Sequence, residues 1–571
     1  MSRKLLRPMA LAVLGLFITG ACAQSAADTD AVNLATVNAL VGVNPSVTPQ
    51  SRADELSLIG GGSTVPDSDL YEYQDDVWIT STDGTRLSAN VFRPTATTPG
   101  QKFPAIIFVN SWSLDEYEYT QQAIKFAKKG YIVLSYSTRG FGKSEGLINT
   151  AGPKDMVDLG RALDWLEANT SVDAGNIGIC GISYGAGISL LGLANHPRIK
   201  TAVPMSGWAN LQTSLYGGDT PRLVWGALLV LSGYATGNMD PVILEHYTNI
   251  LTNRNIPEVI EWAGERSPAN VINKINARNA PVYISNNYGD NLFQPNPMID
   301  FYKGLTGPKR LDLNQGIHAT AEIGGVLGLS NFVWNNAHDW FDHFLKGENT
   351  GILNRPAVTM ELKFSNRREE YANWDAANAA RTTYYMSPRG WFSNGGLKTS
   401  PNGKYANTKI YSGDSGASTG IPLLSPIVEG HIDLPVKKWI PGISRTHGVV
   451  YESSKLSSGK KLRGDVKAKV WITPSGSKAQ VAAYLYAVDG WGVGTLITHG
   501  TASLHNATPG RSTQVSVDLV ATAYDLAPGH KLAIAFDTFD LQYGVPTLAP
   551  YSIKFNHSSN KQSTLEISGL N

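Results

Sequence analysis

The sequence predicts an α/β fold followed by an all-β region, and three observations support this organisation. Short apolar runs alternate with stretches of helical periodicity between residues 104 and 348, which indicates β-α-β units and a parallel sheet covered by helices on both faces. One insertion, residues 207–280, interrupts the series and is rich in Leu, Trp and Tyr. After about residue 349 the helical pattern stops, and short runs alternate with turns rich in Gly, Ser, Asn and Pro.

The elements of the α/β region follow from this alternation. Asp83-Gly84 between two alternating runs is a strong hairpin signal and marks the beginning of the folded body. We expect strands at residues 77–80, 87–92, 105–109, 131–136, 177–180, 201–205, 281–285 and 309–313, and helices at 119–129, 156–166 and 186–194. The all-β region should contain strands at 357–364, 466–472, 481–487 and 531–536, in a sandwich or jelly roll.

The bulk composition limits the possible functions. At 571 residues the chain is longer than one core usually supports, so two or three domains are expected. A formal charge of +1 with 17% charged residues leaves no basic face, which argues against nucleic acid as a partner. With only two cysteines there is no disulfide framework, and Cys180 is interpreted as a buried strand residue.

The N-terminal region has the features of an export signal. In residues 1–23, basic side chains precede an apolar run and small residues follow it, which is typical of a signal peptide. Residues 21–23 fit an A-x-A cleavage site, whereas the same region also resembles a bacterial lipobox that would place a lipid anchor on Cys22. Both routes predict a periplasmic, secreted or outer-membrane lipoprotein location. Residues 24–70 are polar and periodless and should form a flexible tether.

The strongest chemical signal lies in residues 176–194, where an apolar run leads directly into G-I-S-Y-G and a run of small residues follows. Strand, glycine-flanked serine and helix are the context of a nucleophile elbow, so Ser183 is the predicted nucleophile. Two other G-x-S-x-G matches, around Ser144 and Ser418, lack the following helix or the preceding strand. With 57 glycines in the chain, about one match is expected by chance, and both are interpreted as turns.

A nucleophilic serine needs a histidine base, and the histidine needs an acid that holds its tautomer. The expected order along the chain is Ser, then Asp or Glu, then His, each on a loop after a strand. Asp290 follows the strand at 281–285, although a turn aspartate is its alternative interpretation. His318 follows the strand at 309–313 and alone among the eleven histidines has that placement.

The oxyanion hole should take one N–H from Tyr184, the residue after the nucleophile. A second donor should come from the loop after the strand at 105–109, where Trp112 could donate its indole N–H or could equally form pocket wall. The insertion at 207–280 lies at the carboxyl side of the strands, so we interpret it as a helical cap over the site. A second structural domain is the alternative.

Two further motifs are discounted. His338, Asp339, Asp342 and His343 are spaced like metal ligands, but they lie in an amphipathic helix, so a solvated helix face is favoured and no metal is predicted. Gly142-Lys143-Ser144 lacks the earlier glycine of a phosphate loop, so no nucleotide is predicted. The chemistry that remains needs no cofactor.

With these residues in place, the chain resembles the Xaa-Pro dipeptidyl-peptidase and cocaine-esterase family of α/β-hydrolases (the CocE/NonD type) over nearly all of residues 75–571. Two motifs give the most specific support for this resemblance, T-R-G-F-G-K-S-E-G at residues 138–146 and W-F-D-H-F-L-K-G at 340–347. G-I-S-Y-G at the elbow and A-P-G-H-K-L at 527–532 add to them. Trp112 departs from the family, whose members usually have a tyrosine there that serves the oxyanion hole. Ser137 before the T-R-G motif, where an aspartate is common, and Gln315-Gly316-Ile317 before His318 depart from the family as well. These changes flank the substrate, so they affect specificity more than reaction type.

The resemblance implies an α/β-hydrolase domain over residues 71–206 and 281–348, a helical cap insertion at 207–280 and a C-terminal jelly roll at 349–571. It carries the nucleophile, acid and base to the three residues assigned above from their positions, Ser183, Asp290 and His318. The predicted function is an exported serine hydrolase acting on a small ester or a short peptide, with esters favoured. The alternatives are an Xaa-Pro dipeptidyl-peptidase and, from another class, a glycan- or peptide-binding protein with a relic hydrolase core. The oligomeric state is left open.

Overall fold

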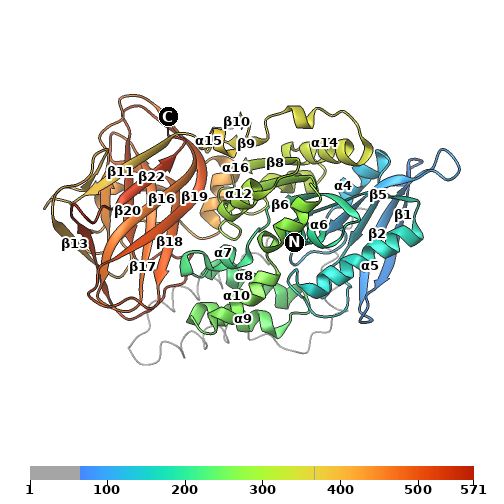
Figure 1. The fold of residues 1–571 in the computed structure, drawn as a ribbon, viewed down its shortest axis with the longest axis horizontal. Coiled ribbons are helices and arrows are strands. Elements are labelled where there is room, and N and C mark those ends of the chain that lie inside the picture. The colour runs from blue at the N-terminus through green and yellow to red at the C-terminus, as the bar shows by residue number, and fades with distance from the viewer. Residues whose placement is uncertain (1–64, 366, 571) are drawn as a thin grey trace.

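The computed structural model describes residues 65–365 and 367–570. The predicted signal peptide and nearly all of the predicted tether lie outside the described residues. Two β-sheets organise the rest, one inside a helical α/β domain and one in a C-terminal β domain, with a group of helices below the α/β domain (Figure 1). The predicted fold class is therefore confirmed, while the jelly-roll topology stays a prediction. No helix in the described part of the chain is both long and apolar enough to cross a membrane.

The first sheet has ten strands in the order β1-β2-β4-β3-β5-β6-β7-β8-β9-β10. The strands from β4 to β9 in this order pair in parallel, and the pairs at the two edges are antiparallel. Their bounds are β1 (Tyr71–Thr80), β2 (Arg86–Pro94), β3 (Phe103–Val109), β4 (Ile132–Tyr136), β5 (Val172–Ile182), β6 (Ile199–Met205), β7 (Val282–Asn287), β8 (Lys309–Asn314), β9 (Val358–Glu361) and β10 (Arg368–Tyr371).

The alternation of side chains along β3 shows how the sheet is covered. Ala105, Ile107 and Val109 join one buried cluster with residues of α5 and α6, while Ile106 and Phe108 join another with residues of α4 and α14. Because successive strand residues point to opposite faces, both faces are buried. The helices are α4 (Thr120–Lys128), α5 (Pro153–Asn169), α6 (Tyr184–Asn195), α11 (Ile272–Ala277), α12 (Pro295–Gly304), α13 (Thr320–Val326) and α14 (Phe332–Lys346).

The cap helices lie between β6 and β7 in the chain and are drawn in green beneath the sheet in Figure 1. They are α7 (Leu211–Tyr216), α8 (Leu223–Thr236), α9 (Pro241–Thr252) and α10 (Ile256–Glu265), with short 3₁₀ turns η1 (Gly217–Asp219) and η2 (Pro268–Val271). The start of the cap is joined to the end of α10, since Trp208 donates its indole N–H to the Arg266 carbonyl at 2.7 Å.

The β domain contains a mixed sheet of twelve strands with its own apolar core. The strands are β11 (Arg381–Ser387), β12 (Gly395–Lys398), β13 (Ala406–Tyr411), β14 (Lys437–Trp439), β15 (Val449–Glu452), β16 (Lys460–Pro474), β17 (Ala479–Val488), β18 (Val493–Leu504), β19 (Thr513–Leu526), β20 (Lys531–Asp537), β21 (Ser552–His557) and β22 (Thr564–Ser568). Its smaller elements are η3 (Ile352–Asn354), α15 (Trp374–Ala377), α16 (Leu424–Ile432) and η4 (Ile440–Gly442).

Helix α16 corrects the expectation that helical structure stops after about residue 349. Its nine residues carry only a weak apolar pattern, and the helix is stabilised by contact with the α/β domain rather than by its own sequence. Gln315, just after β8, donates its side-chain amide to the Glu429 carbonyl at 2.9 Å and to Asp433 at 2.6 Å. The β domain therefore braces the loop that carries His318.

Candidate active site

Ser183 lies between β5 and α6 with φ 58° and ψ −114°, a strained conformation for a residue other than glycine. The two flanking glycines allow it. A Cβ at Gly185 would lie 2.1 Å from the Val109 carbonyl oxygen, and one at Gly181 would lie 2.6 Å from the Gly185 backbone. Glycine at both positions thus lets the turn close tightly against β3, which is the geometry expected of a nucleophile elbow.

The structure brings the three predicted catalytic side chains together from three separate loops. Nε2 of His318 lies 2.8 Å from Oγ of Ser183, and Nδ1 of His318 lies 2.7 Å from Oδ2 of Asp290. These are hydrogen-bond distances between a nucleophile and a base, and between the base and an orienting acid. The arrangement can activate a serine hydroxyl for attack on an acyl carbon.

Asp290 is fully buried and is fixed by the backbone that follows it. Its Oδ1 accepts hydrogen bonds from the N–H groups of Leu292 at 2.9 Å and Phe293 at 2.8 Å, which leaves Oδ2 for His318. A turn aspartate was the alternative interpretation, and the residue does close a turn. The same turn aims its second oxygen at the histidine.

The electrostatics around His318 include one residue that the sequence interpretation missed, Glu322. Burial opposes protonation of His318, but the charge and hydrogen bond of Asp290 and the charge of Glu322 outweigh it and raise the pKa of the imidazole. Burial also raises the pKa of Glu322, against hydrogen bonds from Ser285 at 2.7 Å and from Ser206 and Asn287. A lone glutamate four residues after the base carries no motif that would have revealed it.

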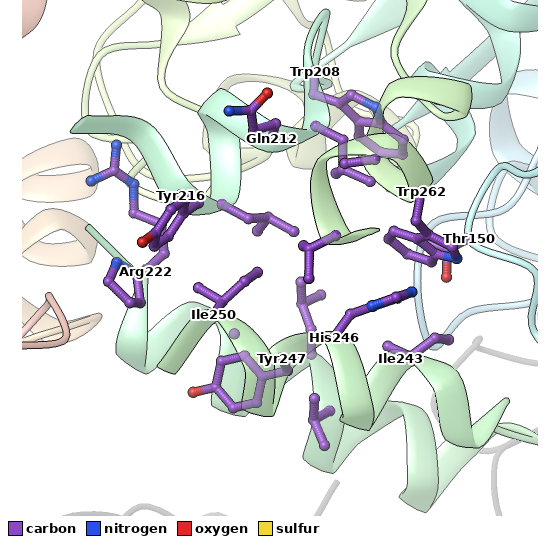
Figure 2. A pocket seen from close by; sticks show the side chains of 18 of the residues that line it. Thr150, Trp208, Gln212, Tyr216, Arg222, Ile243, His246, Tyr247, Ile250 and Trp262 are labelled. Atoms are coloured by element: carbon purple, nitrogen blue, oxygen red, sulfur yellow. The ribbon is translucent and has the colours of Figure 1, made fainter. Parts of the chain in front are cut away.

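Two cavities meet at Ser183. The cap pocket is lined mainly by apolar and aromatic side chains of the cap (Figure 2), among them Trp208, Leu215, Tyr216, Val230, Ile243, Tyr247, Ile250 and Trp262. The open pocket lies on the other side and is lined by His318, Trp225, Leu292, Asp115 and Glu118, among others. Ser183, Trp112 and Leu229 line both, so a bound acyl group can extend into either space.

Comparison with known proteins identifies the family. Two family models match the chain: X-Pro dipeptidyl-peptidase (S15 family) over residues 83–320, and X-Pro dipeptidyl-peptidase C-terminal non-catalytic domain over residues 350–567. The chain belongs to the S15 family. It is a serine hydrolase with an α/β-hydrolase domain and the C-terminal β-rich domain of that family.

The relatives of this S15 hydrolase differ in the activities that their names report. Cocaine esterase of Rhodococcus sp. (strain MB1 Bresler) is 22% identical over 537 residues, 81% of this chain and 90% of the relative. A putative Xaa-Pro dipeptidyl-peptidase of Bacillus anthracis is 21% identical over 462 residues, 74% and 71% of the two chains. A CocE/NonD family hydrolase from Staphylococcus aureus superimposes with a TM-score of 0.67 at 13% identity, covering 87% of this chain and 94% of its own. At such identities the structural likeness shows the fold alone.

The structure places Trp112 of this S15 hydrolase in the pocket wall and corrects the idea of an indole oxyanion donor. Its Nε1–H is donated to the Leu229 carbonyl in α8 at 3.1 Å, so that group is already engaged. A Cβ at Gly233 would lie 2.8 Å from the Trp112 ring, which shows how closely the helix approaches it. Tyr184 is the first residue of α6, where main-chain N–H groups have no acceptor within the helix, so its expected role stays a prediction.

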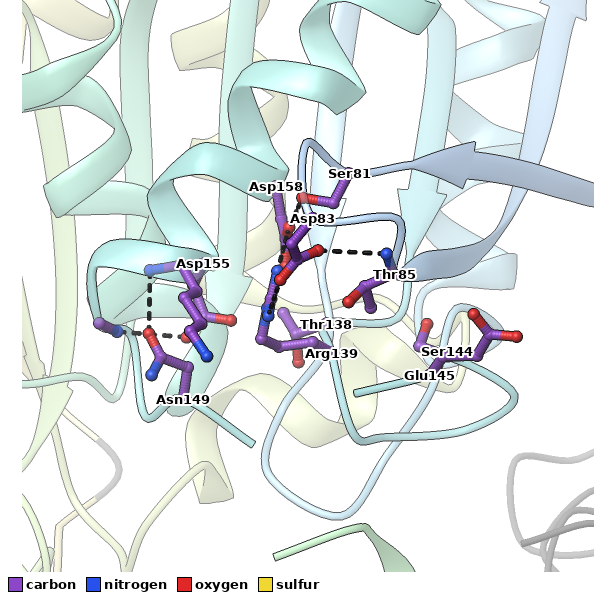
Figure 3. A network of polar contacts seen from close by, with 12 residues as sticks. Ser81, Asp83, Thr85, Thr138, Arg139, Ser144, Glu145, Asn149, Asp155 and Asp158 are labelled. Atoms are coloured by element: carbon purple, nitrogen blue, oxygen red, sulfur yellow. Dashed lines mark hydrogen bonds and ion pairs between the residues drawn. The ribbon is translucent and has the colours of Figure 1, made fainter. Parts of the chain in front are cut away.

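The T-R-G segment of the S15 hydrolase belongs to a network of polar contacts with the β1–β2 turn and α5 (Figure 3). Arg139 is 2% exposed and forms hydrogen-bonded ion pairs with Asp158 of α5 at 2.7 Å and with Asp83 at 3.0 Å. Removing one partner of such a buried pair would leave an uncompensated charge. Asp155, one turn earlier in α5, accepts the Tyr184 hydroxyl at 2.9 Å, which ties the helix to the residue after the nucleophile.

The remaining motifs of the S15 hydrolase have structural partners. Ser144 of the second G-x-S-x-G match accepts a hydrogen bond from the Ser88 N–H at 2.9 Å and donates to the Ser137 carbonyl at 2.7 Å. His338 is buried rather than solvated, stacked on Phe126 with ring centroids 3.8 Å apart and hydrogen-bonded to Gln122, and burial lowers its pKa to about 3. Asp342 is buried too, and Asp339 and His343 are half-buried, so the expected solvated face holds only in part.

The Asp290–His318 contact predicts a pH dependence. Because the imidazole must be neutral to accept the serine proton, kcat/KM should fall as pH falls through the raised pKa of His318. In Asp290→Asn the charge that raises the pKa of His318 is lost, while burial still lowers that pKa, so the acidic limb of the pH–rate profile should move to lower pH. The kcat should also drop about 10⁴-fold, because the imidazole loses the acid that holds its tautomer. Measuring pH–rate profiles with a p-nitrophenyl ester checks both effects.

The matched control is Asp219→Asn, which removes an exposed carboxylate of the cap. It should leave the acidic limb and kcat close to wild type. An Asp290→Asn variant that keeps the wild-type limb would show that Asp290 does not set the titration of the base.

Proposed function

We propose that this chain is a serine hydrolase that forms an acyl-enzyme on Ser183, with His318 as general base and then general acid and Asp290 as its orienting acid. The observation that carries the proposal is the pair of hydrogen bonds of His318, 2.8 Å to Ser183 and 2.7 Å to Asp290. His318 takes the hydroxyl proton as Ser183 attacks the acyl carbon, and returns it from Nε2 to the leaving group. Water then attacks the acyl-enzyme with His318 again as base.

The two cavities support an assignment of the substrate halves. The leaving group receives its proton from His318, and His318 lines the open pocket but is absent from the lining of the cap pocket. The leaving group therefore occupies the open pocket, and the acyl half extends into the cap pocket. Among the described residues that line the cap pocket there is no Asp or Glu.

This lining favours esters over Xaa-Pro peptides. A dipeptidyl-peptidase must bind the free α-ammonium of the acyl half, and burying that cation without a carboxylate costs several kcal/mol. The acids of the cap lie elsewhere: five are exposed, and the sixth, Asp240, caps α9 by accepting the Val242 N–H. The exposed ones are Asp219, Glu245, Glu258, Glu261 and Glu265. Asp115 and Glu118 do face a cavity, but it is the open pocket, on the leaving-group side.

We also propose that the protein is exported, on the strength of the signal-like residues 1–23. Processing at an A-x-A site would give a mature protein that begins at Gln24, whereas lipoprotein processing would give a modified Cys22. Incorporation of radiolabelled palmitate and a globomycin-sensitive precursor should mark the second route. Cell fractions that retain the whole enzyme in the cytoplasm with Met1 intact would contradict export.

The proposed nucleophile can be tested by labelling with a fluorophosphonate probe. The wild-type chain should be labelled, and Ser183→Ala should not, because the probe reacts only with an activated serine. Ser418→Ala is the control, since it changes the serine of another G-x-S-x-G match in a loop of the β domain. An unlabelled wild type, or equal labelling of both variants, would remove the proposal.

The substrate preference can be tested on two panels. We expect p-nitrophenyl acetate or butyrate to be cleaved with a higher kcat/KM than Gly-Pro or Ala-Pro p-nitroanilide, because the cap pocket offers no counter-charge to the α-ammonium. A preference for the prolyl anilides by about tenfold, or about 1.4 kcal/mol of transition-state binding, would favour the dipeptidyl-peptidase alternative instead.

A further inference from the structure

The wall of the cap pocket is mainly apolar but includes Gln212 and Arg222, and the Arg222 guanidinium already donates to the Ser214 carbonyl and to Gln294. Two further buried polar atoms have no hydrogen-bond partner among the described residues. They are Nδ1 of His246 and Oγ1 of Thr150, and both residues line the pocket (Figure 2). Buried polar atoms in folded proteins are nearly always paired, because an unpaired one forfeits its hydration without compensation. A pair of such atoms lining one cavity beside a nucleophile therefore points to a ligand.

His246 is built into the pocket rather than exposed at its mouth. It is 4% exposed, projects from α9, and packs its ring against Trp262 with centroids 4.8 Å apart. Burial lowers its pKa, so the ring is neutral at pH 7 and offers one donor and one acceptor nitrogen. A neutral imidazole suits an uncharged polar group.

Thr150 presents its hydroxyl from a strained segment. Thr150 and Ala151 both have positive φ, 55° and 56°, which is unusual for any residue with a side chain and most costly for a β-branched one. Neighbouring contacts hold the segment in place, since the Ala151 N–H is donated to the Tyr184 hydroxyl at 3.1 Å. The same tyrosine follows the nucleophile, so this segment is fixed relative to Ser183.

We propose that the cap pocket binds an uncharged, bulky acyl group and that His246 and Thr150 hydrogen-bond to a neutral amide within it. This inference rests on the proposed function, because the assignment of the acyl half to the cap pocket follows from His318 acting on the leaving group. The substrate class is an ester whose acyl half is an N-acylated, amino-acid-like chain with no free ammonium. The apolar lining binds its carbon skeleton, and the two polar side chains select the amide.

The test uses matched pairs of p-nitrophenyl esters. One member carries an N-benzoyl amide two, three or four bonds from the ester carbonyl (glycine, β-alanine and 4-aminobutanoate derivatives). The other replaces the amide by a branched alkyl segment of the same shape. The readout is the ratio of kcat/KM for the amide ester to kcat/KM for its alkyl partner. This ratio is compared between each variant and the wild type, so the intrinsic reactivity of each ester cancels.

In His246→Leu the ratio should fall about tenfold or more for at least one chain length, and in Thr150→Val it should fall in the same pair. His343→Ala changes a half-buried histidine outside the pocket and should keep the wild-type ratio. A ratio that stays at the wild-type value for all three chain lengths in His246→Leu overturns the inference. If His246→Leu does not fold, the isosteric Thr150→Val decides: an unchanged ratio in that variant also overturns the inference.

Fluorophosphonate labelling separates this failure from failure of the proposed function. A wild-type chain that is neither labelled at Ser183 nor active on any ester removes both proposals. A wild type that is labelled and cleaves both members of every pair, with ratios that His246→Leu and Thr150→Val do not change, removes the amide assignment alone.

Discussion

The tight contact of the elbow with β3 is the constraint on which the site depends. Because Gly185 has no side chain, its Cα packs against the Val109 carbonyl, where a Cβ would lie at 2.1 Å. Two more glycines allow similarly close packing, one in α6 and one at the start of the cap. A Cβ at Gly187 would lie 2.3 Å from the Trp208 ring, and one at Gly207 would lie 2.4 Å from Ala186. The small residues of α6 therefore set the helix close to the sheet and bring the first residues of the cap next to the nucleophile.

From this fixed point, the base is positioned by parts of the chain that are far apart in sequence. Asp290 orients the imidazole directly. Glu322 adds a second buried carboxyl, which accepts hydrogen bonds from Ser206 after β6 and from Ser285 and Asn287 of β7. The segment before His318 is held from the other side, since Gln315 bonds to α16 of the β domain and its N–H is donated to Glu361 at 3.0 Å. The β domain thus contributes to the site by bracing the base loop, without supplying a catalytic side chain.

The parts that could be predicted from sequence are those that local pattern and chain order determine. The β-α-β alternation and the elbow depend on neighbouring residues, and Ser183, Asp290 and His318 follow from their places after consecutive strands. The strained φ of Ser183 follows from the same local pattern. Trp112, Glu322 and α16 could not be assigned, because the partner of each lies far away in the sequence. The indole of Trp112 bonds to Leu229, 117 residues later, and no periodicity encodes that contact.

Trp112 also explains why substrate class is harder to predict than reaction type. Its ring meets Tyr184 edge-on, with centroids 5.6 Å apart, and its N–H reaches the cap, so one side chain joins the β3 loop, the residue after the nucleophile and α8. The wall between the two cavities is therefore assembled from three segments, and two of them, the β3 loop and α8, carry no residue of the triad. A change in the cap can alter the shape of the acyl side while Ser183, His318 and Asp290 keep their distances. Reaction type depends on those distances, whereas selectivity depends on how the cap packs around them.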